Sequence, residues 1–218
     1  MRILRLSFAI VLADQITKLF VKGFSVPFLG VHVHGLELGS SIPIIGDFLR
    51  LTYIENPGMA FGIDVGGKLF FSLFSIVASV GILIYLYKSR HENLAYRISL
   101  AMILGGALGN LIDRVFYGVI FNEGPLFYGR VVDFIDTDFF NINIFGYHMT
   151  RWPVFNVADA SVTCGVLLLL LSHRWSPSVK PASGEAMPQT ETSGQANGDI
   201  ITAPNQPSPP SANEQQVS

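Results

Sequence analysis

Charged residues are scarce in this chain. Asp, Glu, Lys and Arg make up only 14% of its 218 residues, whereas hydrophobic residues make up 50%. An average soluble domain contains about 25% charged residues. Water is therefore not the main solvent of this protein, and the composition predicts a protein embedded in a membrane.

Cysteine is almost absent. The one cysteine, Cys164, cannot form a disulfide within the chain, so packing and hydrogen bonds must hold the outward-facing parts together. Cys164 lies inside an apolar block, and we interpret it as a small buried hydrophobic residue.

The chain also has no excess of basic over acidic residues. The formal net charge is -2, which provides no positive field for a nucleic-acid backbone. We therefore expect no nucleic acid among the partners of this protein.

Four apolar blocks are each long enough to cross about 30 Å of hydrocarbon, which takes roughly 20 helical residues. They span about residues 3–21, 69–87, 98–116 and 153–172. The first block follows two arginines, as a secretory signal peptide does, but it continues without a cleavage region, so we interpret it as a retained helix. The sequence thus predicts an all-α membrane protein with four transmembrane helices.

Two long connections separate these helices, at about residues 23–67 and 117–151. Alternating stretches such as "VHVHGLEL" predict short strands, and therefore a small β-containing extracytoplasmic subdomain. Residues 1–174 form one membrane domain in this interpretation. Residues 175–218 are rich in Pro, Ser, Gly and Gln, a composition that predicts a disordered cytoplasmic tail.

The distribution of basic residues predicts the orientation. Four helices place both termini on the same side of the membrane. Lys and Arg are equally numerous on both sides, but Lys88, Arg90 and Arg97 are concentrated in and just after the short turn between the second and third helices. The positive-inside rule assigns this turn, and with it both termini, to the cytoplasm.

Asp14 and Lys18 lie within the first predicted helix, four residues apart and hence on one face. A charged group at the centre of a spanning helix costs about 2.5 to 3.5 kcal/mol on insertion scales. Two interpretations stay open: a structural ion pair that fixes helix packing, or a direct role in a functional site.

The third helix contains "GGALGNLIDR". Gly105 and Gly109 form a seam of small residues along which another helix can approach closely. Asn110 and Arg114 lie one turn apart on a shared face. Arg114 is always charged and needs a partner near the membrane, and we interpret Asp113 as that partner.

The fourth helix carries "FNVADASVTC", in which Asn156, Asp159 and Thr163 form one polar stripe. Counting from Pro153, we expect Asp159 about 9 Å below the start of the helix. Asp159 is either a structural hydrogen-bond acceptor or a catalytic group.

The second connection ends in "RVVDFIDTDFF". Asp133 is flanked by Val131, Val132 and Phe134, and such an apolar collar predicts a raised pKa. We interpret Asp136 and Asp138 as ordinary solvated acids.

Other chemistries lack an essential residue. His91 and Glu92 begin a zinc-protease signature, but Ala95 occupies the position of its second histidine. His32 and His34 alternate along a predicted strand and lack a third ligand. A serine or cysteine nucleophile has no base nearby. We therefore expect no metal and no cofactor, and the two aspartates described above remain as the natural pair.

Five motifs, "DQITK", "NPGMAFG", "GNLIDR", "VVDF" and "FNVAD", occur in this order between residues 1 and 174. In these motifs the chain resembles lipoprotein signal peptidase, also called signal peptidase II. The resemblance implies an aspartic endopeptidase of the bacterial cytoplasmic membrane, and we expect it to be a monomer without cofactor. It would act at the outer, periplasmic face on diacylglyceryl-modified prolipoproteins and cleave just before the lipidated cysteine.

The resemblance also implies roles for single residues. Asp133 and Asp159 correspond to the catalytic pair. Six polar residues correspond to positions that support the substrate, its lipid or the pair: Asp14, Lys18, Asn56, Asn110, Arg114 and Asn156.

Two departures from the family pattern are visible. Ala160 stands where a serine is expected, so hydroxyl support there is lost or moved to Ser161. The stretch 117–130 is longer than the usual connection.

Two other functions account for some of the same residues. A small proton- or ion-coupled transporter would also keep carboxylates inside the membrane, although the chain shows no internal repeat of the kind that many carriers have. A non-enzymatic assembly factor would tolerate replacement of both Asp133 and Asp159 by asparagine.

Overall fold

The computed structural model describes residues 2–58, 67–138, 142–144, 147–149 and 151–174, all within the compact unit Met1–Pro177. The predicted disordered tail at 175–218 lies outside the described residues.

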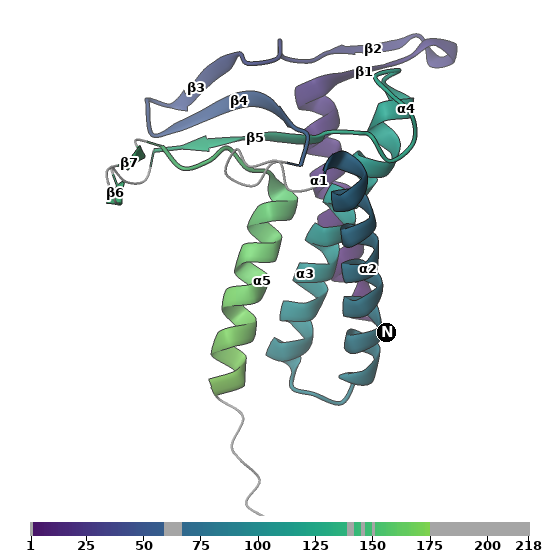
Figure 1. Ribbon diagram of the computed structural model, residues 1–218, viewed down its shortest axis with the longest axis vertical. Coiled ribbons are helices and arrows are strands. Elements are labelled where there is room, and N and C mark those ends of the chain that lie inside the picture. Colours follow the sequence, from purple (N-terminus) through teal and green to yellow (C-terminus); the bar gives the residue numbers. More distant parts are fainter. Residues whose placement is uncertain (1, 59–66, 139–141, 145–146, 150, 175–218) are drawn as a thin grey trace, which may run out of the picture. The chain divides into compact units, whose positions relative to one another are not determined.

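Helix α3 is the centre of the helical part, where it packs against α1, α2 and α5 (Figure 1). The helical elements are α1 (Leu4–Lys22), α2 (Gly67–Lys88), α3 (Leu94–Ile112), the π-helical turn η2 (Asp113–Tyr117), the short α4 (Gly118–Ile120) and α5 (Val157–Arg174). Asn93 begins α3 because its side chain accepts the backbone N–H of Tyr96 at 2.8 Å.

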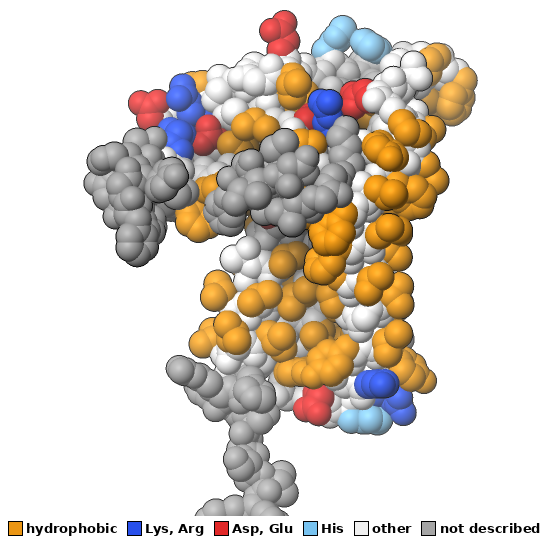
Figure 2. Space-filling model, viewed as in Figure 1, with side chains coloured by type: hydrophobic (Ala, Val, Ile, Leu, Met, Phe, Trp, Pro, Cys, Tyr) orange, Lys and Arg blue, Asp and Glu red, His pale blue; other side chains and the backbone are white. Residues whose placement is uncertain are grey.

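Two helical stretches among the described residues are long and apolar enough to cross a membrane, Leu69–Lys88 and Leu94–Ile120. At 1.5 Å per residue, α2 is about 33 Å long, which matches the roughly 30 Å of the hydrocarbon layer. Apolar side chains cover the surface of the helices in Figure 2, with basic and acidic groups gathered at the two ends. Helix α1 contains Asp14 and Lys18, and these two charged groups are completely buried.

The seam of small residues predicted on α3 is confirmed. Gly105 contacts α1, and Gly109 lies against both Asp14 and Ala158. Gly106 extends the seam toward α5, because a Cβ atom built there would stand 2.3 Å from the carbonyl oxygen of Ala158. The glycines let the backbones approach more closely than any side chain would allow.

Replacing Gly106 with alanine is therefore expected to push α5 away from α3. Overpacking of this kind costs roughly 1 to 3 kcal/mol of the free energy of unfolding, so the melting temperature of the purified protein should fall. Gly81→Ala is the matched control, because a Cβ at Gly81 of α2 meets nothing within 4 Å. This control is expected to leave the melting temperature unchanged or to raise it. Equal melting temperatures for the two variants would contradict the packing argument.

The strands predicted in the first connection are confirmed, and the second connection adds one to the same sheet. The elements are β1 (Gly23–Val26), the 3₁₀ turn η1 (Pro27–Leu29), β2 (Val31–His34), β3 (Ser41–Ile45), β4 (Leu49–Asn56), β5 (Val131–Thr137), β6 (Ile142–Ile144) and β7 (Tyr147–Met149). Strands β3, β4 and β5 form an antiparallel sheet in that order, while β1–β2 and β6–β7 are separate hairpins.

The sheet lies at the end of the helices where α1 finishes and α5 begins (Figure 1). A cluster of buried side chains joins the two parts: Val21, Tyr53, Tyr117, Val132 and Phe134. Burial opposes ionisation of Glu55 in β4, but hydrogen bonds from Lys22 and Tyr53 outweigh it and lower its pKa. The end of α1 is thus ion-paired to β4 at a place that water hardly reaches.

Helix α5 begins at Val157, four residues later than the proline from which we counted. The reason is strand pairing: Phe155 exchanges backbone hydrogen bonds with Ile135 of β5, at 3.1 Å and 2.7 Å, so the chain is still extended there. The predicted depth of Asp159 was therefore wrong. Asp159 lies in the first turn of the helix, about 3 Å beyond its start at 1.5 Å per residue.

The interpretation of Cys164 as a buried residue was also wrong. Its side chain is exposed on α5, next to Thr163, which is exposed too. Periodicity within an almost wholly apolar segment does not separate the side of a helix that faces protein from the side that faces lipid.

Candidate active site

Asp133 lies in the middle of β5, opposite Ile54 of β4. It is buried, with 4% of its surface exposed, and the side chains of Asn156 and Asn56 hydrogen-bond to it. Burial, and after it the charge of Asp159, raises the pKa of Asp133 to about 7. The raised pKa expected from its apolar neighbours is confirmed.

Asp159 is held by the start of its own helix. The Asn156 side chain accepts the backbone N–H of Asp159 at 2.9 Å, and the Asp159 carboxylate accepts the backbone N–H of Asn156 at 3.3 Å. This reciprocal pair is a capping box, which satisfies donors that the first turn of a helix leaves free. The same two residues therefore begin α5 and fix the position of the carboxylate.

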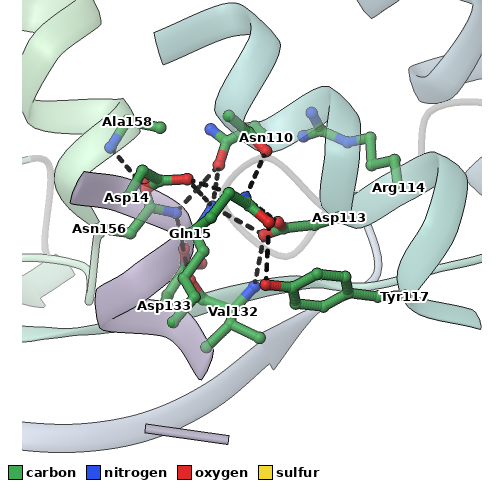
Figure 3. A network of polar contacts seen from close by, with 12 residues as sticks. Asp14, Gln15, Asn110, Asp113, Arg114, Tyr117, Val132, Asp133, Asn156 and Ala158 are labelled. Carbon is green, nitrogen blue, oxygen red and sulfur yellow. Dashed lines mark hydrogen bonds and ion pairs between the residues drawn. The ribbon is translucent and has the colours of Figure 1, made fainter. Parts of the chain in front are cut away.

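Asn156 joins the two aspartates. It is completely buried, and its side-chain amide donates to Asp133 at 2.6 Å while its backbone donates to Asp159. Asn110 of α3 strengthens the link: its oxygen accepts from the Asn156 amide at 3.1 Å and its nitrogen donates to Asp159 at 2.7 Å. The structure thus brings together side chains from β5, α3 and α5 that are far apart in the sequence (Figure 3).

Asp14 and Lys18 form the buried ion pair that their spacing predicted, at 2.8 Å and with no exposed side-chain surface. Lys18 also contacts the oxygen of Asn110 at 2.8 Å, which connects the pair to the region of the two aspartates. The structural ion pair is confirmed, and a direct role in the site stays a prediction. The partner assigned to Asp113 was wrong, because Asp113 pairs with Lys18 at 2.7 Å instead of with Arg114.

Arg114 faces a groove between α2, α3 and α5. Its guanidinium donates to Ser75 at 3.2 Å, whereas its Nε atom has no hydrogen-bond partner among the described residues. The groove has a volume of about 510 Å³ and is lined by Phe70, Phe71, Phe74, Ser75, Asn110, Arg114, Asp159, Val162 and Thr163. An apolar wall beside a carboxylate and a guanidinium suits an extended peptide with apolar side chains.

Asn56 is the last residue of β4, opposite Val131 of β5. Its side chain bonds to Asp133 and also accepts the backbone N–H of Gly58 at 2.9 Å. All eight site residues that the sequence pointed to therefore belong to one connected region. The motif that follows Asn56 continues into residues 59–62, which lie outside the described residues.

Three polar residues of this region were missed in the sequence or given another role. Gln15 donates to Asp113 at 2.8 Å, and Tyr117 donates to Gln15 at 3.1 Å. Asp113 is the third, since it joins Lys18 and Gln15. Gln15 could have been noticed as a polar residue next to Asp14 inside an apolar helix. Its contacts with Asp113 and Tyr117 could not, because these residues lie about 100 positions later in the chain.

Asp136 was wrongly interpreted as a solvated acid. It is buried, accepts a hydrogen bond from Thr52 at 2.7 Å and pairs with Arg151 at 2.7 Å. Asp138 is more exposed and lies 3.8 Å from Arg151. These contacts stabilise the C-terminal end of β5 and do not involve the two aspartates of the site.

The hydroxyl of Ser161 does not replace the one lost at Ala160. Its Oγ donates to the carbonyl oxygen of Met102 at 3.0 Å, so it serves the contact between α5 and α3.

Other candidate groups lie elsewhere. His32 and His34 stand side by side on β2, with ring centroids 4.4 Å apart. His91 accepts a hydrogen bond from Arg90 in the turn between α2 and α3. No group of three or more His, Cys, Asp or Glu side chains that could hold a metal occurs among the described residues.

The arrangement is suited to general acid–base chemistry. Asp133 has a pKa near neutrality and can carry a proton. Both oxygens of Asp159 accept hydrogen bonds, as those of an ionised carboxylate do. Two neighbouring carboxyl groups with different surroundings can act together as an acid and a base.

Comparisons with known proteins agree on one family. The sequence profile described as "Signal peptidase (SPase) II" matches residues 6–174. The lipoprotein signal peptidase of Pelodictyon phaeoclathratiforme is 35% identical over 170 residues, covering 78% of this chain and 90% of that protein. The lipoprotein signal peptidase of Chlorobaculum tepidum is 37% identical over 172 residues, covering 77% and 91%.

A solved structure described as a bacterial membrane enzyme has the same fold. It superimposes with a TM-score of 0.60 at 31% sequence identity, covering 81% of this chain and 94% of the other.

Proposed function

Because this chain belongs to the signal peptidase II family, we propose that it is an aspartic endopeptidase that removes the signal peptide from diacylglyceryl-modified prolipoproteins. Cleavage falls just before the lipidated cysteine. The observation that carries the aspartic mechanism is the position of Asn156, which hydrogen-bonds to both Asp133 and Asp159.

In the proposed reaction Asp159 acts as the general base and Asp133 as the general acid. The ionised Asp159 takes a proton from a water molecule, whose oxygen bonds to the carbon of the scissile peptide. The protonated Asp133 donates to the carbonyl oxygen, which becomes the oxygen of a tetrahedral intermediate. When the C–N bond breaks, the leaving nitrogen receives the proton that Asp159 took, and Asp133 takes back a proton from a hydroxyl of the intermediate as the C=O bond re-forms. No metal or cofactor takes part.

Arg114 and the groove bind the substrate in this proposal. The Nε of Arg114, which has no hydrogen-bond partner in the part of the chain that the structure describes, is placed to donate to a carbonyl oxygen of the substrate. The phenylalanines of α2 provide an apolar wall for the end of the signal helix, and Asn110 supports Asp159 through a hydrogen bond of 2.7 Å. In this proposal the groove opens toward lipid, which suits a substrate that carries both an apolar helix and acyl chains.

The membrane topology is part of the proposal. Helices α1, α2, α3 and α5 cross the bacterial cytoplasmic membrane, and residues 1–174 form the peptidase domain of a monomer. The basic turn between α2 and α3, both termini and a disordered tail at 175–218 face the cytoplasm. The aspartates then lie toward the periplasm, because they are at the opposite end of these helices from that turn (Figure 1). Membrane lipid surrounds the four helices.

The transporter alternative finds no support in the comparisons, since the relatives carry a peptidase name. The activities of the Asp133→Asn and Asp159→Asn variants distinguish a peptidase from an assembly factor, which would tolerate the loss of both aspartates.

The purified protein in detergent or lipid is expected to cleave a prolipoprotein that carries the diacylglyceryl group and to leave the unmodified precursor intact. Mass spectrometry of the products should place the new N-terminus at the lipidated cysteine. A chelator should not change the rate. Equal cleavage of both precursors would contradict the proposed substrate class, and strong inhibition by the chelator would contradict the metal-free mechanism.

A further inference from the structure

An ion cluster lies buried beside the two aspartates of the site. Lys18 contacts Asp14 at 2.8 Å and Asp113 at 2.7 Å, and none of these three side chains has any exposed surface. Charges are costly to bury unless every acceptor finds a donor. Backbone N–H groups are among the donors to the two carboxylates of this cluster, and they identify the segments that the cluster holds in place.

Asp113 reaches the strand that carries Asp133. Its Oδ2 atom accepts the backbone N–H of Val132 at 3.3 Å, and Val132 directly precedes Asp133 in β5. Its Oδ1 atom accepts from Gln15 at 2.8 Å. Gln15 is fixed in turn by the hydroxyl of Tyr117, so the carboxylate of Asp113 has little freedom to turn.

Asp14 reaches the helix that carries Asp159. Its Oδ1 atom accepts the backbone N–H of Ala158 at 2.9 Å, and Ala158 directly precedes Asp159 in α5. This N–H belongs to the first turn of the helix, where donors have no partner within the helix itself. A carboxylate from α1 thus completes the N-terminus of α5.

The two contacts have the same form. In each, a carboxylate of the cluster binds the backbone N–H of the residue just before one of the two aspartates. Lys18 joins the two carboxylates and also contacts Asn110, whose amide donates to Asp159. The distance between β5 and the start of α5 is therefore bounded by a short chain of buried ionic contacts.

We propose that Asp113 is a positioning residue, which together with Lys18 and Asp14 sets the separation of Asp133 and Asp159 by holding the backbone beside each of them. The inference rests on the proposed function of the pair. Asp113 does not touch substrate in this account, and it acts only through the position of Asp133. Correct geometry matters, because a misplacement of about 1 Å can reduce the rate of an enzyme roughly 100-fold.

Asp113→Asn tests this role, since asparagine keeps the shape but removes the charge that attracts Lys18. The single-turnover rate with lipidated prolipoprotein is expected to fall about 10- to 100-fold, while KM changes less than about threefold because substrate contacts remain. The amide proton resonance of Val132 should move upfield as its hydrogen bond to a carboxylate is lost. Rates are compared for protein of equal folded fraction, measured by gel filtration and circular dichroism.

Ser7→Ala is the matched control. Ser7 is buried and joins α1 to α3 through a hydrogen bond of 2.7 Å to the carbonyl oxygen of Ala101, without touching the cluster. This variant should keep both the rate and the Val132 resonance of the wild type. If Asp113→Asn fails to fold, Gln15→Met provides the test, because it removes the hydrogen bonds from Gln15 to Asp113, Asp14 and the carbonyl of Gly109 and leaves the ion pairs of Lys18. It should lower the rate about threefold to tenfold at unchanged KM.

Three results would overturn the inference. The first is an unchanged rate in Asp113→Asn, or in Gln15→Met if Asp113→Asn does not fold. The second is an equal loss of rate in Ser7→Ala, and the third is a rise in KM that accounts for the whole loss of activity. The proposed function fails separately. If the wild-type protein does not cleave the lipidated precursor, the peptidase assignment is wrong, whereas wild-type cleavage with a fully active Asp113→Asn variant removes only the positioning role.

Discussion

Replacing Asp133 with asparagine is expected to lower the rate of prolipoprotein cleavage by about 1,000-fold, within the range that a positioned acid or base contributes. Asparagine has nearly the same shape and can still accept the hydrogen bond from Asn156, so the fold should persist. It cannot donate a proton to the scissile carbonyl. A single-turnover assay with the diacylglyceryl-modified precursor measures the loss.

Asp159→Asn should reduce the rate to a similar level, and the double variant should be no slower than either single variant, because groups that act as one unit are not additive. Asp138→Asn is the control. Asp138 follows β5 and lies 3.8 Å from Arg151, so it belongs to the same connection without touching the pair. Full activity in both Asp133→Asn and Asp159→Asn would remove the aspartic mechanism and favour the assembly-factor alternative.

Local patterns in the sequence predicted much of this site. The spacing of Asp14 and Lys18 places them on one helical face, and the structure shows them as a buried pair. The apolar neighbours of Asp133 correctly indicated burial and a raised pKa. These predictions depended only on residues within a few positions of each other, where helix and strand geometry is fixed.

Long-range partners could not be predicted in this way. Asp113 was assigned to its neighbour Arg114, but it pairs with Lys18, which lies 95 positions earlier in the chain. Asp136 was assigned to solvent, but Thr52 and Arg151 enclose it. In both cases the choice of partner depends on which helices and strands pack together, and spacing along one segment does not contain that information.

The start of α5 shows the same limit in the backbone. Proline is favoured in the first turn of a helix, which made Pro153 a reasonable start. The chain instead stays extended through Phe155, because pairing with β5 satisfies its backbone groups, and the capping box at Asn156 then begins the helix. Tertiary pairing outweighed a local preference, and it moved Asp159 from the interior of the helix to its first turn.

The dependence of activity on pH follows from the unequal surroundings of the two aspartates. Burial and the neighbouring charge raise the pKa of Asp133 to about 7, so below that pH Asp133 keeps its proton and can act as the acid. Above it the proton is lost, and each further pH unit should reduce kcat/KM about tenfold. This fall of kcat/KM at high pH reports on the two aspartates as a coupled pair, since the charge of Asp159 contributes to the raised pKa of Asp133.

In the proposed mechanism two carboxyl groups held around Asn156 share one proton, and the pH profile of kcat/KM with lipidated prolipoprotein shows whether they do. The melting temperature, recorded at each pH, separates loss of activity from loss of fold. We expect kcat/KM to fall about 100-fold over the two pH units above about 8, with the fold intact. A value of kcat/KM that stays constant or rises over that range would rule out Asp133 as the proton donor.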